Sequence, residues 1–444
     1  MRYIPNTQTQ QQEMLQAIGM QHMDDLFAIV PEEVRLKRGL NLPGAMSEME
    51  LSAHMKRMAA SNMNCDNAVC FLGAGAYDHF IPSVVHHLLS RQEFYTAYTP
   101  YQPEISQGTL QAIFEFQSMI CMLTGMDVAN ASMYDGASAL AEAAMMACRT
   151  AGRDEVLVCR SVSPQNREVL NTYARFKGIK TTTFRYHNGR ADLNDLESKI
   201  SADTAAIVIQ SPNFFGVIEE LEPIAELAHR HKAALIVSCD PISLGLLKAP
   251  GLLGADIAVG EGQPLGNPIS FGGPYLGFFA AKQKWLRKMP GRIVGETVDR
   301  EGKRGFVLTI QAREQHIRRE KATSNICSNE ALCALAATIY LTAMGRQGLR
   351  EVAEQCVSKS RYAYDQLIKT GAFEPVFDAP FFREFALRYK GEVASLNEKL
   401  LKDGIIGGYD LGCDYEELTG AWLVAVTEKR TKAEIDRLAE RVAL

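Results

Sequence analysis

The sequence lacks the features of a membrane or secreted protein. No apolar run reaches the roughly 18 residues of a membrane-spanning helix. The polar start, Met1–Gln8, is followed by no apolar stretch, so we expect no signal peptide. The ten cysteines contain no Cys-x-x-Cys pair, which indicates reduced thiols in a cytoplasmic protein and gives no spacing for a metal site. Lys and Arg form no cluster and the net charge is −5, which excludes nucleic acid and anionic membranes as main partners.

The length of 444 residues exceeds what one compact core accommodates, so we expect two domains and an appended arm. Residues 1–64 carry apolar side chains at helical spacing, such as Met14, Leu15 and Ile18. They predict a helical arm that lays an apolar face on its own body or on a second subunit. Residues 65–328 predict a large α/β domain, and residues 329–444 predict a smaller one.

Short apolar runs alternate with helical stretches through the large domain. The strand-like runs are 155–159, 181–184, 205–210, 234–238 and 257–259. Such strands, separated by helices, are typical of a mostly parallel sheet covered on both faces. A long helix (329–360), strands at 382–389 and 422–426 and a last helix (432–442) predict the small domain. This α/β order fits the aspartate aminotransferase type (fold type I) of pyridoxal-phosphate enzymes, and it also fits other α/β enzymes.

Two features match what a pyridoxal-phosphate site needs. Tyr134–Leu140 is a turn of small residues before a helix, where free backbone N–H groups and the helix dipole favour a phosphate, with Ser138 as the hydroxyl. A plain helix cap explains these residues equally well. Asp240 follows a core strand, at the edge where such sheets bind ligands, and suits the pyridine nitrogen. A turn aspartate before Pro241 is the equal alternative.

The lysine that should bind the cofactor aldehyde is missing. It is expected after the carboxylate, yet Asp256–Pro274 contains no lysine. Lys248 comes too early, and Lys282 and Lys284 come late, in a charged segment. The sequence therefore predicts a site that is built without its nucleophile. Glu261 and Gln263 are candidates to fill the space that a cofactor would take.

Several motifs resemble one known family. The most specific is Arg91–Gly108, and the supporting runs are Gly73–His79, Tyr134–Ala139, Gln210–Gly216, Gly272–Pro274 and Arg319–Cys327. With these motifs the sequence resembles the P-protein (glycine decarboxylase) family of the glycine cleavage system. Within that family it resembles the alpha subunit, subunit 1, of the two-subunit form.

The resemblance implies an alpha–beta heterotetramer in which the beta subunit carries the lysine and the pyridoxal phosphate. The alpha subunit has the same fold without the lysine and is expected to be inactive alone. Together the two subunits would decarboxylate glycine, pass the aminomethyl group to the lipoyl group of the H-protein and release CO2. The beta subunit, the lipoylated H-protein and glycine are thus the expected partners.

The same resemblance, with the polar and proline-stiffened segment 95–107, predicts residues that complete the partner's active site: Tyr98, Thr99, Tyr101, Gln102, Glu104 and Gln107. An ordinary interface loop with tyrosine anchors is the alternative. Thr323, Ser324 and Asn325 resemble a loop that contacts the partner's phosphate, although they also suit a cap for the helix near Ser328.

The histidines give no metal site. His79 is expected to be a structural hydrogen-bonding residue, and the adjacent His86 and His87 cannot share one helix face. Two rival functions stay open. The first is a self-sufficient pyridoxal-phosphate enzyme with an unexpected lysine such as Lys321. The second is a structural scaffold that only stabilises the catalytic subunit.

Overall fold

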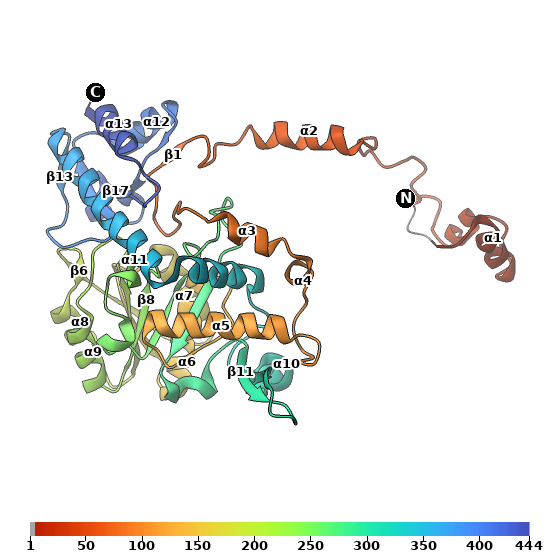
Figure 1. Cartoon of the computed structure of the whole chain (residues 1–444), viewed down its shortest axis with the longest axis horizontal. Helices are drawn as coiled ribbons and strands as arrows, with labels where there is room; N and C mark the ends of the chain where they lie inside the picture. Colours follow the sequence, from red (N-terminus) through yellow and green to blue (C-terminus); the bar gives the residue numbers. More distant parts are fainter. Residues whose placement is uncertain (1–4, 444) are drawn as a thin grey trace. The chain divides into compact units, whose positions relative to one another are not determined.

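The computed structural model describes residues 5–443 (Figure 1). The chain divides into two compact units, Met1–Met63 and Asn64–Leu444. The first unit contains α1 (Gln8–Ala17), η1 (Met23–Phe27) and α2 (Glu48–Ala59), which confirms its helical character. Capping boxes at Thr7 and Ser47 start α1 and α2. Across the described residues, no helix combines the length and apolar composition that a membrane crossing requires.

The second unit is built on a seven-stranded sheet with the order β2-β10-β9-β8-β7-β3-β4. Only the pairs that include β10 are antiparallel among those of this sheet, so the prediction of a mostly parallel sheet is confirmed. The strands are β2 (Val128–Ala129), β3 (Glu155–Cys159), β4 (Lys180–Phe184), β7 (Thr204–Ser211), β8 (Ala234–Cys239), β9 (Ile257–Glu261) and β10 (Gly277–Ala281). Sequence reasoning missed β2 and β10.

Helices bury apolar faces against this sheet. They include α5 (Gln107–Thr124), α6 (Gly136–Ala151), α7 (Pro164–Arg175), α8 (Leu193–Lys199) and α9 (Leu221–Arg230). The helix α6 packs against β7, β8, β9 and β10 and is buried along most of its length. Its small side chains, such as Ala139 and Ala143, allow the helix axis to approach the sheet closely. This close approach brings the first turn of α6 to the carboxyl ends of the central strands.

A second, antiparallel sheet follows in the order β13-β14-β17-β16. Its strands are β13 (Phe373–Pro375), β14 (Glu384–Tyr389), β16 (Tyr409–Asp410) and β17 (Ala421–Ala425), and α12 (Val393–Lys402) and α13 (Lys432–Ala443) accompany them. Phe373 stacks on Trp422 with 5.5 Å between ring centroids in its core. Phe71 lies in the same core, because β1 (Val69–Cys70) pairs with β15 (Ile405–Ile406).

The long helix α11 (Ala331–Lys369) serves both cores. Ala337 and Tyr340 pack in the core of the large sheet, whereas Ala363 and Leu367 pack in that of the second sheet. The helix is broken at Gly345, whose φ of 61° is left-handed and suits glycine. The predicted helix 329–360 is thus present, longer and interrupted. The domain bounds 1–64, 65–328 and 329–444 stay predictions.

The large sheet should depend on its buried aliphatic residues. Ile236 lies in the middle of β8 and is fully buried, so Ile236→Ala should lower the free energy of unfolding by about 2–5 kcal/mol. Urea denaturation followed by circular dichroism measures this loss. The control Phe176→Ala, at a side chain that is 81% exposed, should change stability by about 0.5 kcal/mol or less. Equal losses in the two variants would contradict this account of the core.

Candidate functional site

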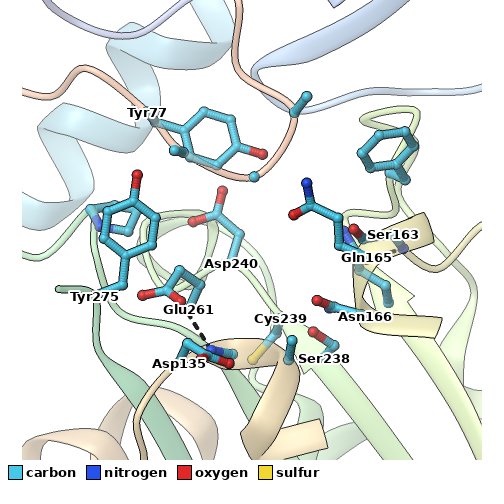
Figure 2. A pocket seen from close by; sticks show the side chains of 18 of the residues that line it. Tyr77, Asp135, Ser163, Gln165, Asn166, Ser238, Cys239, Asp240, Glu261 and Tyr275 are labelled. Carbon is cyan, nitrogen blue, oxygen red and sulfur yellow. Dashed lines mark hydrogen bonds between the residues drawn. The ribbon is translucent and has the colours of Figure 1, made fainter. Parts of the chain in front are cut away.

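A cleft with a volume of 1020 Å³ lies where the central strands of the large sheet end (Figure 2). Ser238, Cys239 and Asp240 reach it from β8, and Glu261 reaches it from β9. The second sheet contributes Arg383 and Glu384. The remaining walls come from segments 73–77, 134–138, 163–173, 210–216 and 264–275, with Glu330 and Phe382. This is the position at which doubly wound sheets bind ligands.

The amino terminus of α6 forms the floor of the cleft. Asp135 is the N-cap, and its carboxylate accepts a hydrogen bond of 2.7 Å from the Ser138 amide. The Ser138 hydroxyl completes the capping box by accepting from the Asp135 amide at 3.2 Å. The first amide of the helix, that of Gly136, donates to the Glu261 carboxylate at 2.9 Å. A protein carboxylate therefore takes the place that an anionic ligand would occupy at this helix.

Glu261 is held by three backbone amides in a position with little water around it. Besides Gly136, the amides of Gln263 and Leu276 donate to its carboxylate at 3.0 and 2.9 Å. Burial raises the pKa of Glu261 to about 7, and these hydrogen bonds oppose that shift. Gln263 lies beneath the cleft rather than in it, because its side chain bonds to the backbone of Tyr77 and Asn267. Of the two predicted fillers, Glu261 alone lines the cleft.

Asp240 lies in the cleft as predicted, but it is already paired. Its carboxylate forms an ion pair of 2.7 Å with Arg383, whose side chain is 2% exposed. The Arg383 guanidinium also stacks over the Tyr77 ring, 3.3 Å from the centroid. Sequence reasoning missed Arg383 and Tyr77. Only the motif Gly73–His79 pointed to the segment that holds Tyr77.

Glu384, next to Arg383, is the second buried carboxyl of the cleft. It accepts hydrogen bonds of 2.7 Å from the Ala74 amide and 2.6 Å from the Tyr77 hydroxyl. Burial raises the pKa of Glu384 to about 7, against the opposing effects of the Tyr77 hydroxyl and the Arg383 charge. This group therefore changes its charge near neutral pH.

These residues do not fit a pyridoxal phosphate. No lysine is present among the described residues that line the cleft, so the aldehyde has no amine to bind. The Glu261 carboxylate lies at the helix terminus and would repel a phosphate there. The Asp240 carboxylate already forms an ion pair with Arg383 and is not available to a pyridine nitrogen. Arg383 is the one cationic side chain of the lining, beside six carboxyl groups: Asp135, Glu168, Asp240, Glu261, Glu330 and Glu384. An acidic cleft without an amine disfavours an anionic cofactor.

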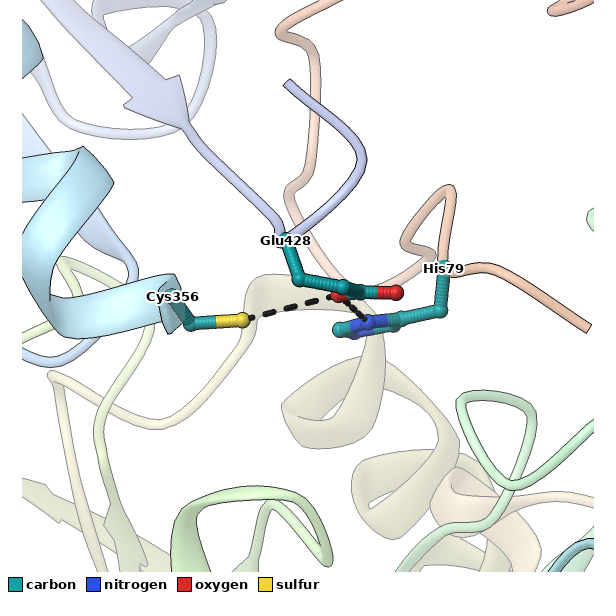
Figure 3. Close-up of side chains that lie close together, drawn as sticks. All are labelled: His79, Cys356 and Glu428. Carbon is teal, nitrogen blue, oxygen red and sulfur yellow. Dashed lines mark hydrogen bonds and ion pairs between the residues drawn. The ribbon is translucent and has the colours of Figure 1, made fainter. Parts of the chain in front are cut away.

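His79, Cys356 and Glu428 form a cluster (Figure 3), and His79 contacts Arg383. His79 Nδ1 lies 2.6 Å from the Glu428 carboxylate, and the Cys356 thiol lies 3.7 Å from it. An arginine can only donate, so the Arg383 contact makes His79 Nε2 the acceptor and places the proton on Nδ1. A metal on Nδ1 would force a proton onto Nε2, facing the arginine donor. The contacts therefore describe a hydrogen-bonding network, and the structural role of His79 stays a prediction.

Comparisons with known proteins identify the family of this chain. A profile described as "Glycine cleavage system P-protein" matches residues 1–442. The chain belongs to this family. It is 58% identical over 442 residues to the "Probable glycine dehydrogenase (decarboxylating) subunit 1" of Desulforamulus reducens, covering 100% of this chain and 99% of the relative. It also matches a crystal structure of glycine decarboxylase (P-protein) of the glycine cleavage system in inhibitor-bound form, with a TM-score of 0.91 and 44% identity, covering 100% and 99% of the two chains.

More distant structures show the fold. Glutamate decarboxylase of Lactobacillus brevis matches with a TM-score of 0.70 at 12% identity, covering 94% of this chain and 96% of that one. The prediction of the aspartate aminotransferase type, fold type I, is confirmed, and the large mostly parallel sheet agrees with it. Enzymes of this fold type use pyridoxal phosphate, which supports this cofactor for the family.

The segment predicted to complete a partner's site lies away from the cleft. It joins α4 (Gln92–Tyr95) to α5, and none of its six candidate residues is among the described residues that line the cleft. The side chain of Tyr98 is 85% exposed, and Tyr101, Gln102 and Glu104 are exposed as well. Gln107 instead holds the backbone of Phe306, accepting from its amide at 2.9 Å and donating to its carbonyl at 2.8 Å. Gln107 therefore anchors the segment.

The second predicted group also lies outside the cleft. The Ser324 hydroxyl accepts from the Ile326 amide at 3.0 Å and is nearly buried, whereas Asn325 is exposed and Thr323 half-buried. The alternative that these residues cap the following helix is wrong, because α11 has Glu330 as its N-cap. Their contact with a partner's phosphate stays a prediction.

The raised pKa of Glu384 generates a test of stability against pH. A carboxyl group with a higher pKa in the folded than in the unfolded state binds its proton more tightly in the folded state. It therefore stabilises the fold fully at pH values below its unfolded-state pKa. This contribution is lost as the pH rises through about 7. Relative to Glu384→Gln, which keeps an acceptor for the Ala74 amide, the wild type should therefore lose about 1–3 kcal/mol of unfolding free energy between about pH 5 and pH 8.

Urea denaturation at several pH values measures this difference. The control Glu374→Gln removes an exposed carboxyl from β13 and should show little dependence on pH. A difference between wild type and Glu384→Gln that stays constant over this range would show that Glu384 is ionised throughout.

Proposed function

We propose that this chain is the lysine-free subunit of a heteromeric glycine decarboxylase. The partner subunit would supply the lysine and hold the pyridoxal phosphate, which would serve as the electron sink for loss of CO2. The aminomethyl group from glycine then passes to the lipoyl group of the H-protein. The relative named subunit 1 supports a second subunit, and the family membership supports the reaction.

One observation carries this proposal. The cleft has the place and size of a cofactor site, yet it has no amine and holds the Glu261 carboxylate at its anion position. A chain of this family with such a cleft does not bind the cofactor itself. Its contribution to the reaction must then be made in the site of another polypeptide.

The segment between α4 and α5 is the proposed contribution to that site. Tyr98, Thr99, Tyr101, Gln102 and Glu104 supply hydroxyl, amide and carboxyl groups on one short segment, and most of them are exposed. Gln107 fixes the end of the segment to β12 (Arg304–Thr309). Anchored polar groups are preorganised, which suits positioning of a substrate and movement of a proton. Thr323, Ser324 and Asn325 would approach the partner's phosphate.

Substitutions in this segment test the proposal in the complex reconstituted with a lysine-bearing partner. Glu104→Gln and Tyr98→Phe each remove an acidic proton site and should lower the glycine–bicarbonate exchange rate by about 100-fold. The control Glu222→Gln removes an exposed carboxyl from α9 and should keep the full rate. Size-exclusion chromatography establishes that all variants assemble. Full exchange by Glu104→Gln and Tyr98→Phe in intact complexes would favour the scaffold function instead.

A further inference from the structure

A second pocket lies beneath the same segment, between α4, the first turns of α11, and α5. It has a volume of 240 Å³. The helices α5 and α11 pack side by side there (Figure 1). Tyr98, Thr99 and Pro100 form one wall, so the pocket and the segment share a boundary. None of its lining residues belongs to the cleft described above.

One end of the pocket holds a buried cation. Arg292 is 4% exposed, and among the described residues that line the pocket it is the one that carries a charge. Its guanidinium donates to the Tyr101 hydroxyl at 3.1 Å and to the Ser328 hydroxyl at 3.4 Å, while its Nε has no partner. No carboxylate of the described residues forms an ion pair with it, unlike Arg383. A buried guanidinium without a counter-charge is costly, so this end favours an anion.

The start of α11 adds to this preference. Ser328, Asn329, Ala331 and Leu332 line the pocket. The N-cap Glu330 makes no side-chain capping hydrogen bond, which leaves the first amides of the helix without a side-chain acceptor. The positive end of the helix dipole therefore lies at the end of the pocket where Arg292 lies. The side chain of Glu330 borders the larger cleft instead of this pocket.

Most of the rest of the pocket is apolar, although Thr109 and Asn329 also line it. The apolar walls are formed by the side chains of Phe94, Ile113, Phe116, Leu332 and Leu335. A hydrated inorganic anion would match only the Arg292 end and would leave these walls against water. A ligand that matches both ends carries one negative charge and a short hydrocarbon tail.

We propose that this pocket binds a small monocarboxylate with a short apolar tail. The carboxylate pairs with Arg292 and the first amides of α11, and the tail fills the space between Ile113, Phe116 and Leu335. Bound ligand also fixes the wall formed by Tyr98, Thr99 and Pro100. The site belongs to this chain alone, so it goes beyond the proposed function and does not depend on a partner subunit.

Calorimetric titration of the full-length chain tests the site with ligands of matched size. Butyrate is the probe, and n-butanol, n-butylamine and inorganic phosphate are the comparisons. Charge-assisted hydrogen bonds to Arg292 should make butyrate bind about tenfold or more tightly than the neutral alcohol. The amine should bind more weakly still. Equal affinity for butyrate and n-butanol, or tighter binding of phosphate, would overturn the proposal, as would no measurable binding of butyrate.

Three variants locate the binding. Arg292→Gln should weaken butyrate binding by about tenfold or more. Ala112→Leu keeps Arg292 and fills the apolar end, so it should also abolish the preference for butyrate even if Arg292→Gln proves unstable. The matched control Arg287→Gln removes an exposed arginine and should bind as the wild type does. Unchanged butyrate affinity in folded Arg292→Gln or in Ala112→Leu would place the ligand elsewhere and end the proposal.

Discussion

The contact between Glu261 and the amino terminus of α6 determines what the main cleft can hold. The helix presents amides that would bind an anion, and the Glu261 carboxylate already accepts from the first of them. The approach is close enough to require glycine, because a Cβ at Gly136 would lie 2.8 Å from the Glu261 amide nitrogen. The anion position is thus taken by the protein itself, which disfavours a phosphate-bearing cofactor in this cleft.

A network of buried polar side chains lies beside this contact. Asp240 from the large sheet pairs with Arg383, which continues through His79 to Glu428. The network joins segments that are distant in the sequence and belong to both sheets. Removing Asp240 would leave the Arg383 charge buried without a counter-charge, which costs about 3–5 kcal/mol, so this ion pair holds the two sheets in one arrangement. A rigid body of this kind would suit the role proposed above for the segment between α4 and α5.

The sequence predicted most strands of the large sheet, the missing lysine and the position of Asp240, because local sequence patterns indicate each of these features. The apolar runs of β3, β7, β8 and β9, the lysine-free stretch Asp256–Pro274 and the position of Asp240 at a strand end all depend on neighbours in the chain. What was missed depends on tertiary contacts. The residues around Asp240 in the sequence do not indicate that Arg383 is its partner. The hydrogen bonds of Gln107 to Phe306 depend on the packing of α5 against β12. The short strand β2 has too few residues for a periodic pattern.

The central claim is that this chain has no amine that can hold the cofactor aldehyde. The most direct measurement is borohydride reduction of the isolated chain with pyridoxal phosphate, followed by peptide mass mapping. The account predicts no saturable binding and no stoichiometric phosphopyridoxyl adduct on this chain, whereas the reconstituted complex should show the adduct on the partner. A stoichiometric adduct on any lysine of this chain, Lys321 included, would contradict the account.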